Sequence, residues 1–166
     1  MKVYLAGPIT GCTDDEAMDW RAKVADCVGR AGHTVLDPMD WADMRGREHQ
    51  PGVPAQIVKE DKRAIRRADI FFCNALGGIS VGTTMEILYA YQTDTPVILV
   101  TEQEPLSPWY QYHADVIHDS LPGAVNTLGY WLDLQGYKRI SDAARGFRRS
   151  RGCVELDHGE GSEVWE

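Results

Sequence analysis

Short apolar runs alternate along the chain with longer segments in which apolar residues recur every three or four positions. The runs at 2–6, 33–38, 69–75 and 96–100 are rich in apolar residues, and turn residues such as Gly7-Pro8 and Pro38 stop the first two. This pattern predicts strands. Residues 69–75 are nearly all apolar, which is typical of a strand covered on both faces.

Helical spacing fills the segments between these strands. From Asp14 onward, apolar residues recur at positions 17, 20, 24, 27, 28 and 31, which predicts a helix with one buried face. Thr13 or Asp14 can cap its start, and Gly32 stands where a C-terminal glycine would end it. Further helices are expected over 54–68 and from about 82 to 92, and segment 114–128 is expected to add a short strand and a helix.

Repeated strand–helix alternation predicts an α/β fold, a doubly wound and mostly parallel sheet flanked by helices, of the flavodoxin-like or Rossmann-like kind. A chain of 166 residues that is 43% hydrophobic can bury one good core, so we expect a single domain. We assign residues 1–147 to this domain. Residues 148–166 are charged and lack periodicity, and we expect them to form a polar tail that is mobile or docks on a neighbour.

Charge and composition exclude several classes of protein. The formal net charge of −8 argues against a nucleic-acid polymer as partner, because phosphate binding needs a basic face. No apolar run approaches the roughly 20 residues needed to span a bilayer, and the first residues, MKVYLAG, lack the features of a signal peptide. We therefore expect a cytoplasmic protein that does not bind membranes.

The cysteines fit the same picture. Cys12, Cys27, Cys73 and Cys153 lie far apart and form no CxxC pair. We therefore expect neither a structural disulfide nor a zinc site, and we expect Cys27 and Cys73 to be small buried side chains in a reducing compartment.

Three loops are expected to converge at the carboxyl ends of the strands, where sheets of this kind bind ligands. They are residues 7–15, 36–46 and 74–84, and the 39–53 segment is longer than a usual connection. Glycines 77, 78 and 82 allow tight turns and the close approach of a ligand. The helix that begins near Gly82 points its amide groups into the same cleft, which favours an anion.

Glu86 is the candidate reactive group in this region, and two interpretations apply to it. A glutamate near a helix start can simply complement the helix dipole. However, the neighbours at 87–91 are apolar or aromatic, so a solvated carboxylate fits poorly. A carboxylate at the edge of a water-poor pocket can instead act as nucleophile or base.

Other reaction types lack their motifs in this sequence. It contains no G-x-S-x-G elbow, no H-E-x-x-H or other metal-ligand cluster, no G-x-G-x-x-G after the first strand and no Walker A lysine. Carboxylate chemistry without a metal or cofactor is the best remaining interpretation.

Three motifs resemble the nucleoside 2-deoxyribosyltransferase family: YLAGP in the first strand, the D-x7-D spacing from Asp61 to Asp69, and SVGTTME followed by LYA. The resemblance covers roughly residues 1–120, and the family includes hydrolases of 2'-deoxynucleoside 5'-monophosphates. It implies that Glu86 attacks C1' of deoxyribose to form a glycosyl ester, that Tyr4 orients Glu86, and that Asp61 assists departure of the base. Such a retaining displacement needs no metal or cofactor.

Taken singly, these residues have simpler explanations. Tyr4 alone fits an ordinary strand aromatic, Asp61 fits the exposed face of a charged helix, and Asp69 fits a residue that flanks a strand. Only the joint spacing of Tyr4, Asp61 and Glu86 favours a site.

The substrate prediction remains divided between two outcomes. Many transferases of the family carry an aspartate six residues before the nucleophile, whereas this chain has Ser80, which resembles the nucleotide hydrolases and removes repulsion toward a 5'-phosphate. However, the first loop, GPITG, lacks the serine and arginine of those hydrolases, and Thr10 is its only hydroxyl. Base exchange on deoxynucleosides is slightly favoured over hydrolysis of monophosphates. A non-catalytic nucleotide sensor is the alternative from a different class.

Further substrate contacts are assigned by position. They are expected from Gly7 and Thr10 in the first loop, Asp40 and Trp41 in the second, Ser80 and Gly82 in the third, and His113. Segment 107–117 has two interpretations. In one it supplies aromatic or phosphate-binding groups to the site, also to that of a neighbouring subunit. In the other Trp109 and Tyr112 pack an oligomer interface and His113 lies at the surface. Both interpretations predict a homo-oligomer.

Overall fold

The alternating pattern folds into strands and helices in the order expected of an α/β protein. The computed structural model describes residues 1–9, 11–40 and 46–133. The strands are β1 (Lys2–Ala6), β2 (Thr34–Leu36), β3 (Ile70–Asn74), β4 (Val97–Val100) and β5 (Val116–His118). The helices are α1 (Asp14–Arg30), α2 (Val53–Ile65), α3 (Val81–Gln92), α4 (Pro108–His113) and α5 (Leu121–Leu132), with a 3-10 turn η1 at Pro38–Asp40.

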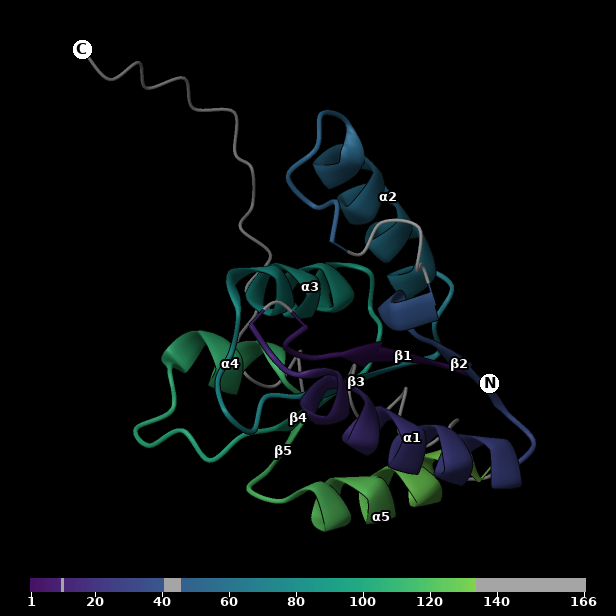
Figure 1. Cartoon of the computed structure of the whole chain (residues 1–166). Coiled ribbons are helices and arrows are strands. Elements are labelled where there is room, and N and C mark those ends of the chain that lie inside the picture. Colours follow the sequence, from purple (N-terminus) through teal and green to yellow (C-terminus); the bar gives the residue numbers. More distant parts are fainter. Residues whose placement is uncertain (10, 41–45, 134–166) are drawn as a thin grey trace, which may run out of the picture.

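The strands form one sheet in the order β2-β1-β3-β4-β5, and each neighbouring pair is parallel (Figure 1). Helices α1 and α5 cover one face, while α2 and α3 cover the other, with α4 packed beside α3 (Figure 1). This flavodoxin-like arrangement confirms the prediction of a single doubly wound α/β domain. In the part of the chain described here, no helix is long and apolar enough to cross a membrane.

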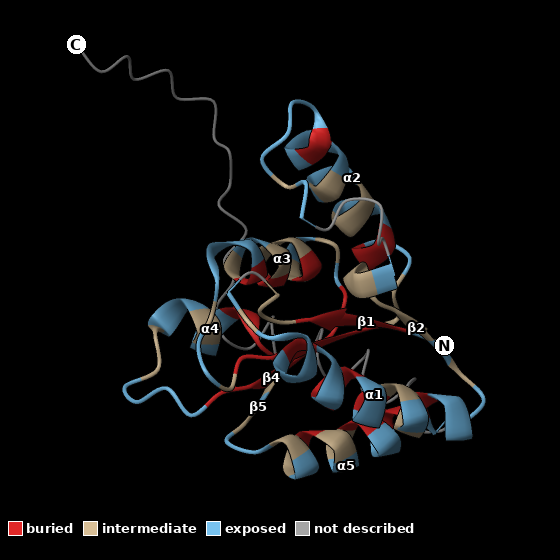
Figure 2. Cartoon of the chain, viewed as in Figure 1, coloured by how far each residue is buried: buried red, intermediate tan, exposed pale blue. Residues whose placement is uncertain are grey.

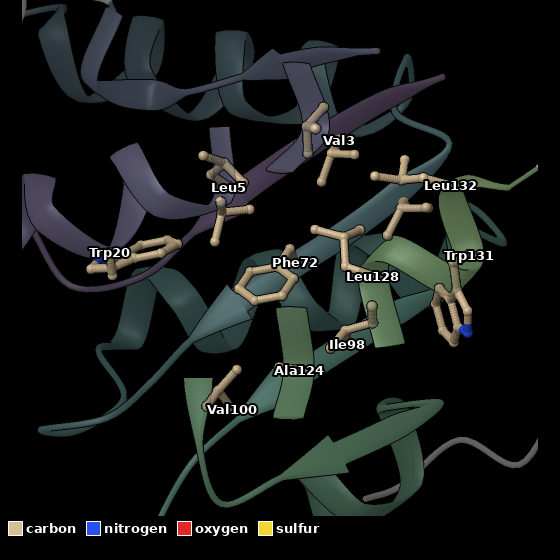
Figure 3. Packing of buried hydrophobic residues seen from close by; sticks show 13 residues of the cluster. Val3, Leu5, Trp20, Phe72, Ile98, Val100, Ala124, Leu128, Trp131 and Leu132 are labelled. Carbon is tan, nitrogen blue, oxygen red and sulfur yellow. The ribbon is translucent and has the colours of Figure 1, made fainter. Parts of the chain in front are cut away.

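Two buried layers hold the sheet between its helices, as the burial colouring in Figure 2 shows. Side chains alternate along each strand, so Val3 and Leu5 of β1 face α1 and α5, whereas Tyr4 and Ala6 face α2 and α3. Figure 3 shows the first layer, which includes Val3, Leu5, Trp20, Phe72, Ile98, Val100 and Leu128. The second layer therefore carries the side chain of Tyr4 toward α2 and α3.

Local signals explain most element boundaries. Thr13 caps α1 in a reciprocal capping box with Glu16, and Gly32 follows the helix with φ of +76°. Helix α3 begins one residue earlier than expected, because the Ser80 side chain accepts a hydrogen bond from the Thr83 amide. Helix α4 was not predicted: its six residues are too few to show a period, although Ser107 and Pro108 form an ordinary helix start.

Two predictions about the buried face of α1 are wrong. Cys27 is only half-buried, unlike the fully buried Cys73, and Ala31 is exposed. The inward face of α1 instead includes Arg21, whose side chain is 1% exposed. A cation therefore occupies a position that the spacing had assigned to the polar surface.

The sheet order places a topological switch point between β1 and β3. The chain leaves β1 toward α1 on one face and leaves β3 toward α3 on the other (Figure 1). In open α/β sheets the crevice at such a point, beyond the carboxyl ends of the strands, is the usual place for a ligand. The loops after β1 and β3 border this crevice.

Candidate active site

Tyr4 is the centre of a hydrogen-bonded group at this edge of the sheet. It lies in the middle of β1, is fully buried and stacks on Phe71 of β3 at a ring-centroid distance of 5.4 Å. Its hydroxyl lies 2.6 Å from Glu86 Oε1 and 3.2 Å from Asp61 Oδ1, so its one hydrogen can be donated to either carboxylate. The structure thus brings together the three residues that the motif spacing singled out.

Helical periodicity explains why the two acids point at Tyr4. Glu86 shares the inward face of α3 with Thr83, Ile87 and Ala90, which are buried. Asp61 precedes the buried Ala64 and Ile65 of α2 by three and four residues, so it lies on the inward face of that helix. Both carboxylates are half-buried and face the same phenol from two helices.

The helix-dipole interpretation of Glu86 does not fit this geometry. Helix α3 begins at Val81, so Glu86 is its sixth residue, and the first turn holds no acidic residue. Because dipole stabilisation falls off within the first turn, it contributes little here. Glu86 instead lies within hydrogen-bond distance of the Tyr4 hydroxyl on β1.

Burial sets unusual protonation states in this group. Burial raises the pKa of Glu86 to about 8; the hydrogen bond from Tyr4 and the charge of Arg21 act in the opposite direction, and the charge of Asp61 adds to the rise. Burial likewise raises the pKa of Asp61 to about 6, against the effect of the Tyr4 bond. Burial and then the two acids raise the pKa of Tyr4 well above its usual value, so Tyr4 remains a donor.

The distances of 2.6 Å and 3.2 Å from the Tyr4 hydroxyl oxygen to Glu86 and Asp61 also limit how far apart the two carboxyl groups can be. The bonded oxygens of Glu86 and Asp61 cannot be more than about 6 Å apart, which is close to the roughly 5–5.5 Å of retaining glycosidases and below the roughly 6.5–9.5 Å of inverting ones. The geometry therefore leaves little room for a water between the carboxyl groups and suits covalent attack by one of them.

Gly7 borders the site where the chain leaves β1. A side-chain carbon at this position would lie 2.7 Å from the Asn74 carbonyl oxygen and 2.8 Å from the Trp20 ring, so only glycine fits without displacing backbone. Thr10 of the same loop lies outside the described residues, and its predicted role stays a prediction.

Ser80 and Gly82 lie at the start of α3, as expected. The Ser80 hydroxyl caps the helix: it accepts from the Thr83 amide at 3.1 Å and lies 2.9 Å from the Thr83 hydroxyl. Thr84 in the same turn lies within 2.8 Å of the Tyr110 hydroxyl, which joins α3 to α4. Gly77 and Gly78 have φ values of +89° and +125° and supply the turn that leads into the helix.

Asp40 lines a hollow of about 210 Å³ between the end of β2 and helix α2. The other lining residues are Val35, Leu36, Asp37, Glu60, Arg63, Ala64 and Arg67. Leu36 is the β2 partner of Tyr4 in the sheet, and Glu60 and Ala64 flank Asp61 on α2. The hollow therefore lies on the β2 side of the Tyr4–Asp61 pair. Trp41 lies outside the described residues.

His113 is buried, so the interpretation that placed it at the surface is wrong. Its imidazole stacks on Trp109 at 5.7 Å and meets the edges of Tyr91 and Tyr112, and its Nδ1 lies 2.7 Å from the Trp109 carbonyl oxygen. These contacts join α4 to α3. Trp109 and Tyr112 stay partly exposed, and their role in an oligomer interface remains a prediction.

No group of three or more His, Cys, Asp or Glu within the described part of the chain is arranged to hold a metal. The side chains that meet here are the two acids and the phenol of Tyr4. This set suits acid–base and nucleophilic chemistry on a polar organic molecule.

Arg21 is the residue of this region that sequence reasoning missed. Its charge acts on both Glu86 and Tyr4 from α1. The available signal was its position, four residues after Ala17 and three before Val24, which places it on the buried face of the helix.

Replacing Tyr4 with phenylalanine tests the phenol. Tyr4→Phe removes the donor to both carboxylates, and because that bond lowers the pKa of each acid, both limbs of a pH–activity profile should move to higher pH. Hydrogen bonds to charged groups contribute about 1.5–3 kcal/mol, so a site that depends on them should lose roughly 10- to 100-fold in kcat. Steady-state kinetics across pH check this; an unchanged rate and profile would contradict the role of Tyr4.

Known proteins resemble this chain in sequence and in fold. Residues 3–139 match a family model described as nucleoside 2-deoxyribosyltransferase. Among solved structures, a 2-deoxyribosyltransferase from the psychrotolerant bacterium Bacillus psychrosaccharolyticus is 21% identical, with a TM-score of 0.58 over 76% of this chain and 91% of that one. The Clostridium botulinum CMP N-glycosidase is 18% identical, with a TM-score of 0.54 over 77% and 98% of the two chains. At these identities both show a shared fold. No curated protein matches the chain by sequence.

Proposed function

The chain belongs to the nucleoside 2-deoxyribosyltransferase family, and on that premise we propose that it cleaves the N-glycosidic bond of 2'-deoxynucleosides and transfers the deoxyribose to an acceptor base. The observation that carries the proposal is the Tyr4 hydroxyl bonded to both Glu86 and Asp61 in the crevice beyond β1 and β3. Two carboxyl groups held at a short separation, one to attack the sugar and one to donate a proton, are the arrangement that a covalent glycosyl transfer needs.

The reaction takes place in two displacements at C1' of the sugar. In the first, a carboxylate oxygen of Glu86 attacks C1', the bond from C1' to the base nitrogen breaks with its electron pair going to the base, and Asp61 donates a proton to the departing base. In the second, a nitrogen of the acceptor base attacks C1' of the ester, the Glu86 carboxylate departs, and Asp61 takes up the acceptor's proton. Tyr4 holds both acids in register throughout.

The hollow beside Asp61 is where we place the base. It lies between β2 and α2, whereas Glu86 approaches Tyr4 from α3 on the other side of Asp61. A base in the hollow would therefore have Asp61 within reach and the sugar between it and Glu86. Asp40 and Arg63 in the hollow's wall offer hydrogen-bond acceptors and donors for the edge of a base.

Hydrolysis of 2'-deoxynucleoside 5'-monophosphates is the second candidate, and Ser80 is the observation that favours it. The residue that begins α3 carries a hydroxyl instead of a carboxylate, and the first turn of the helix holds no acid that would repel a 5'-phosphate. In that case water replaces the acceptor base in the second displacement and Asp61 removes its proton.

One set of incubations separates these candidates. The protein is mixed with deoxynucleosides and with deoxynucleoside monophosphates, each with and without a free acceptor base, and the products are followed by chromatography. New nucleosides that appear only with acceptor support transfer, and free base from monophosphates without acceptor supports hydrolysis. Absence of product across the panel would contradict both and favour a nucleotide-binding protein.

The two carboxyl groups predict a bell-shaped pH dependence of kcat/KM. Below the pKa of about 6 for Asp61, both acids are protonated and the nucleophile is lost; above the pKa of about 8 for Glu86, both are ionised and the proton donor is lost. Between these limits the pair holds one proton, and the productive form carries it on Asp61. We expect a maximum near about pH 7 and a tenfold loss per pH unit outside the limits. A profile that is flat from about pH 5 to 9 would contradict this assignment.

A further inference from the structure

Arg21 has a buried guanidinium on the face of α1 that packs against the sheet. Its side chain is only 1% exposed, and its neighbours on this face, Ala17, Trp20 and Val24, are apolar. A buried cation is costly unless it is paired and hydrogen-bonded. Its presence on this face therefore calls for an explanation beyond packing.

The contacts of Arg21 join the ends of two strands. One terminal nitrogen donates to the Gly7 carbonyl oxygen at 3.2 Å and the other to the carbonyl of Ala17. Its Nε lies 3.2 Å from Asp37 Oδ1, and its guanidinium carbon lies 4.3 Å from the centre of the Trp20 ring. Gly7 follows β1 and Asp37 follows β2, so Arg21 lies at the carboxyl edge of the sheet, where the candidate site is.

Burial has the largest effect on the charge of Glu86, and titratable and charged groups surround it at the same edge. Tyr4 contacts Glu86 from β1, and Asp61 of α2 contacts the same Tyr4 hydroxyl. The buried Cys73 of β3 stays a neutral thiol, because burial raises its pKa far above the usual value. From α4, the phenol of Tyr110 contacts Thr84 in the first turn of α3. Among these groups Arg21 supplies the positive charge, and it acts on Glu86 and on Tyr4.

We propose that Arg21 is a positioning residue of the site: its hydrogen bond to the Gly7 carbonyl oxygen and its ion pair with Asp37 hold the first loop against the end of β2, and its fixed positive charge there favours the ionised carboxylate of Glu86. A guanidinium suits this role because it stays protonated when buried, whereas a lysine there would lose its proton more readily. The inference rests on the proposed function, in which Glu86 must ionise to attack the sugar. The effect of Arg21 on the ionisation of Glu86 can be measured in the absence of substrate.

The test is a carbon-13 NMR titration of protein labelled at the glutamate side-chain carboxyl, with the Glu86 signal assigned by its loss in Glu86→Gln. The titration is repeated for Arg21→Gln, which removes the charge, for Arg21→Lys, which retains one, and for Asp37→Asn, which removes the partner of Arg21. Arg30→Gln is the matched control, because Arg30 is an exposed arginine of the same helix that pairs only with Asp26 among the described residues.

The proposal predicts opposite shifts in two of these variants. The pKa of Glu86 should rise by about half a unit to one unit in Arg21→Gln and should fall in Asp37→Asn, where the charge of Arg21 is no longer balanced. Arg21→Lys should lie between wild type and Arg21→Gln, and Arg30→Gln should match wild type. If Arg21→Gln does not fold, the pKa of Glu86 in Asp37→Asn decides the question. A pKa there that does not fall below the wild-type value would overturn the proposal.

Kinetics then distinguish this inference from the proposed function itself. In an active enzyme, Arg21→Gln should lower the maximum of kcat/KM by roughly 3- to 10-fold and move the alkaline limb upward, because less Glu86 is ionised at neutral pH. An inactive wild type would overturn the proposed function while leaving the titration result intact. An unchanged Glu86 titration in both Arg21→Gln and Asp37→Asn would overturn the role of Arg21 even in an active enzyme.

Discussion

Glu86→Gln is expected to lower kcat by on the order of 10,000-fold with both deoxynucleosides and deoxynucleoside monophosphates, because the amide oxygen cannot form the glycosyl ester. The substitution keeps the size of the side chain and removes a half-buried carboxylate whose pKa burial raises to about 8. Relative to wild type, the variant should therefore gain stability as the pH rises from the ordinary glutamate value of 4.5 to about 8, and the difference should stay constant above that pH. Single-turnover measurement of base release, with a melting curve for each protein, checks both points.

Glu86→Asp supplies the graded control for this variant. It retains the carboxylate but withdraws it by one methylene from Tyr4, to which Glu86 Oε1 is bonded at 2.6 Å. An intermediate loss is expected, since attack depends on distance to C1' as well as on charge. A Glu86→Gln protein with more than a tenth of wild-type activity would exclude the nucleophilic role.

Asp61→Asn should have the second largest effect, a loss of about 100- to 1,000-fold in kcat with poor leaving groups. Asparagine has no proton to give to the departing base, although it can still accept the bond from Tyr4. A deoxynucleoside whose base already carries a positive charge from N-methylation needs no protonation to leave. For that substrate the variant should recover most of the wild-type rate of base release, and the alkaline limb of its pH profile should disappear.

Glu60→Gln is the matched control for Asp61→Asn. Glu60 is the preceding residue of α2, lines the hollow, and pairs loosely with Arg63 at 3.7 Å without contacting Tyr4. Because Glu60 lines the hollow where we place the base, its substitution can change KM, but kcat should change by less than about threefold since Glu60 has no part in the proton transfer. Equal losses in the two variants would mean that charge near the hollow matters and that proton donation by Asp61 does not.

The sequence carried most of what was needed to place the three central residues. Strand alternation determines that Tyr4 faces opposite to Val3 and Leu5, and helical spacing determines that Glu86 and Asp61 share faces with buried apolar residues. The D-x7-D and SVGTTME motifs linked these separate faces to one site. The hydrogen bonds from Tyr4 to both acids agree with that inference.

Arg21 and helix α4 were missed for different physical reasons. A charged side chain is normally assigned to the polar face of a helix, and only its partners Gly7 and Asp37, which come from two other segments, explain its burial. Helix α4 has six residues, too few for a period to appear. For Arg21 the helical spacing pointed inward while the charge pointed outward, and for α4 the segment was too short for any spacing to appear.

Substrate choice depends on contacts between residues distant in sequence. The Ser80 hydroxyl caps α3 through Thr83, and its predicted contact with a 5' group of the substrate stays a prediction. The hollow beside Asp61 is formed by residues of β2, η1 and α2 that lie up to 32 positions apart in the chain. Its shape follows from how α2 packs on the sheet, so the motifs alone could not predict it.

Trapping the sugar on the protein tests the central claim most directly. A deoxynucleoside analogue with fluorine at C2' destabilises the positively charged transition state and slows breakdown of an ester, so intact-protein mass spectrometry should detect the adduct. A mass increase of one fluorodeoxyribosyl group is expected, located by peptide mapping to Glu86 and absent from Glu86→Gln. Base release without any adduct on wild-type protein, or an adduct on another residue, would contradict covalent attack by Glu86.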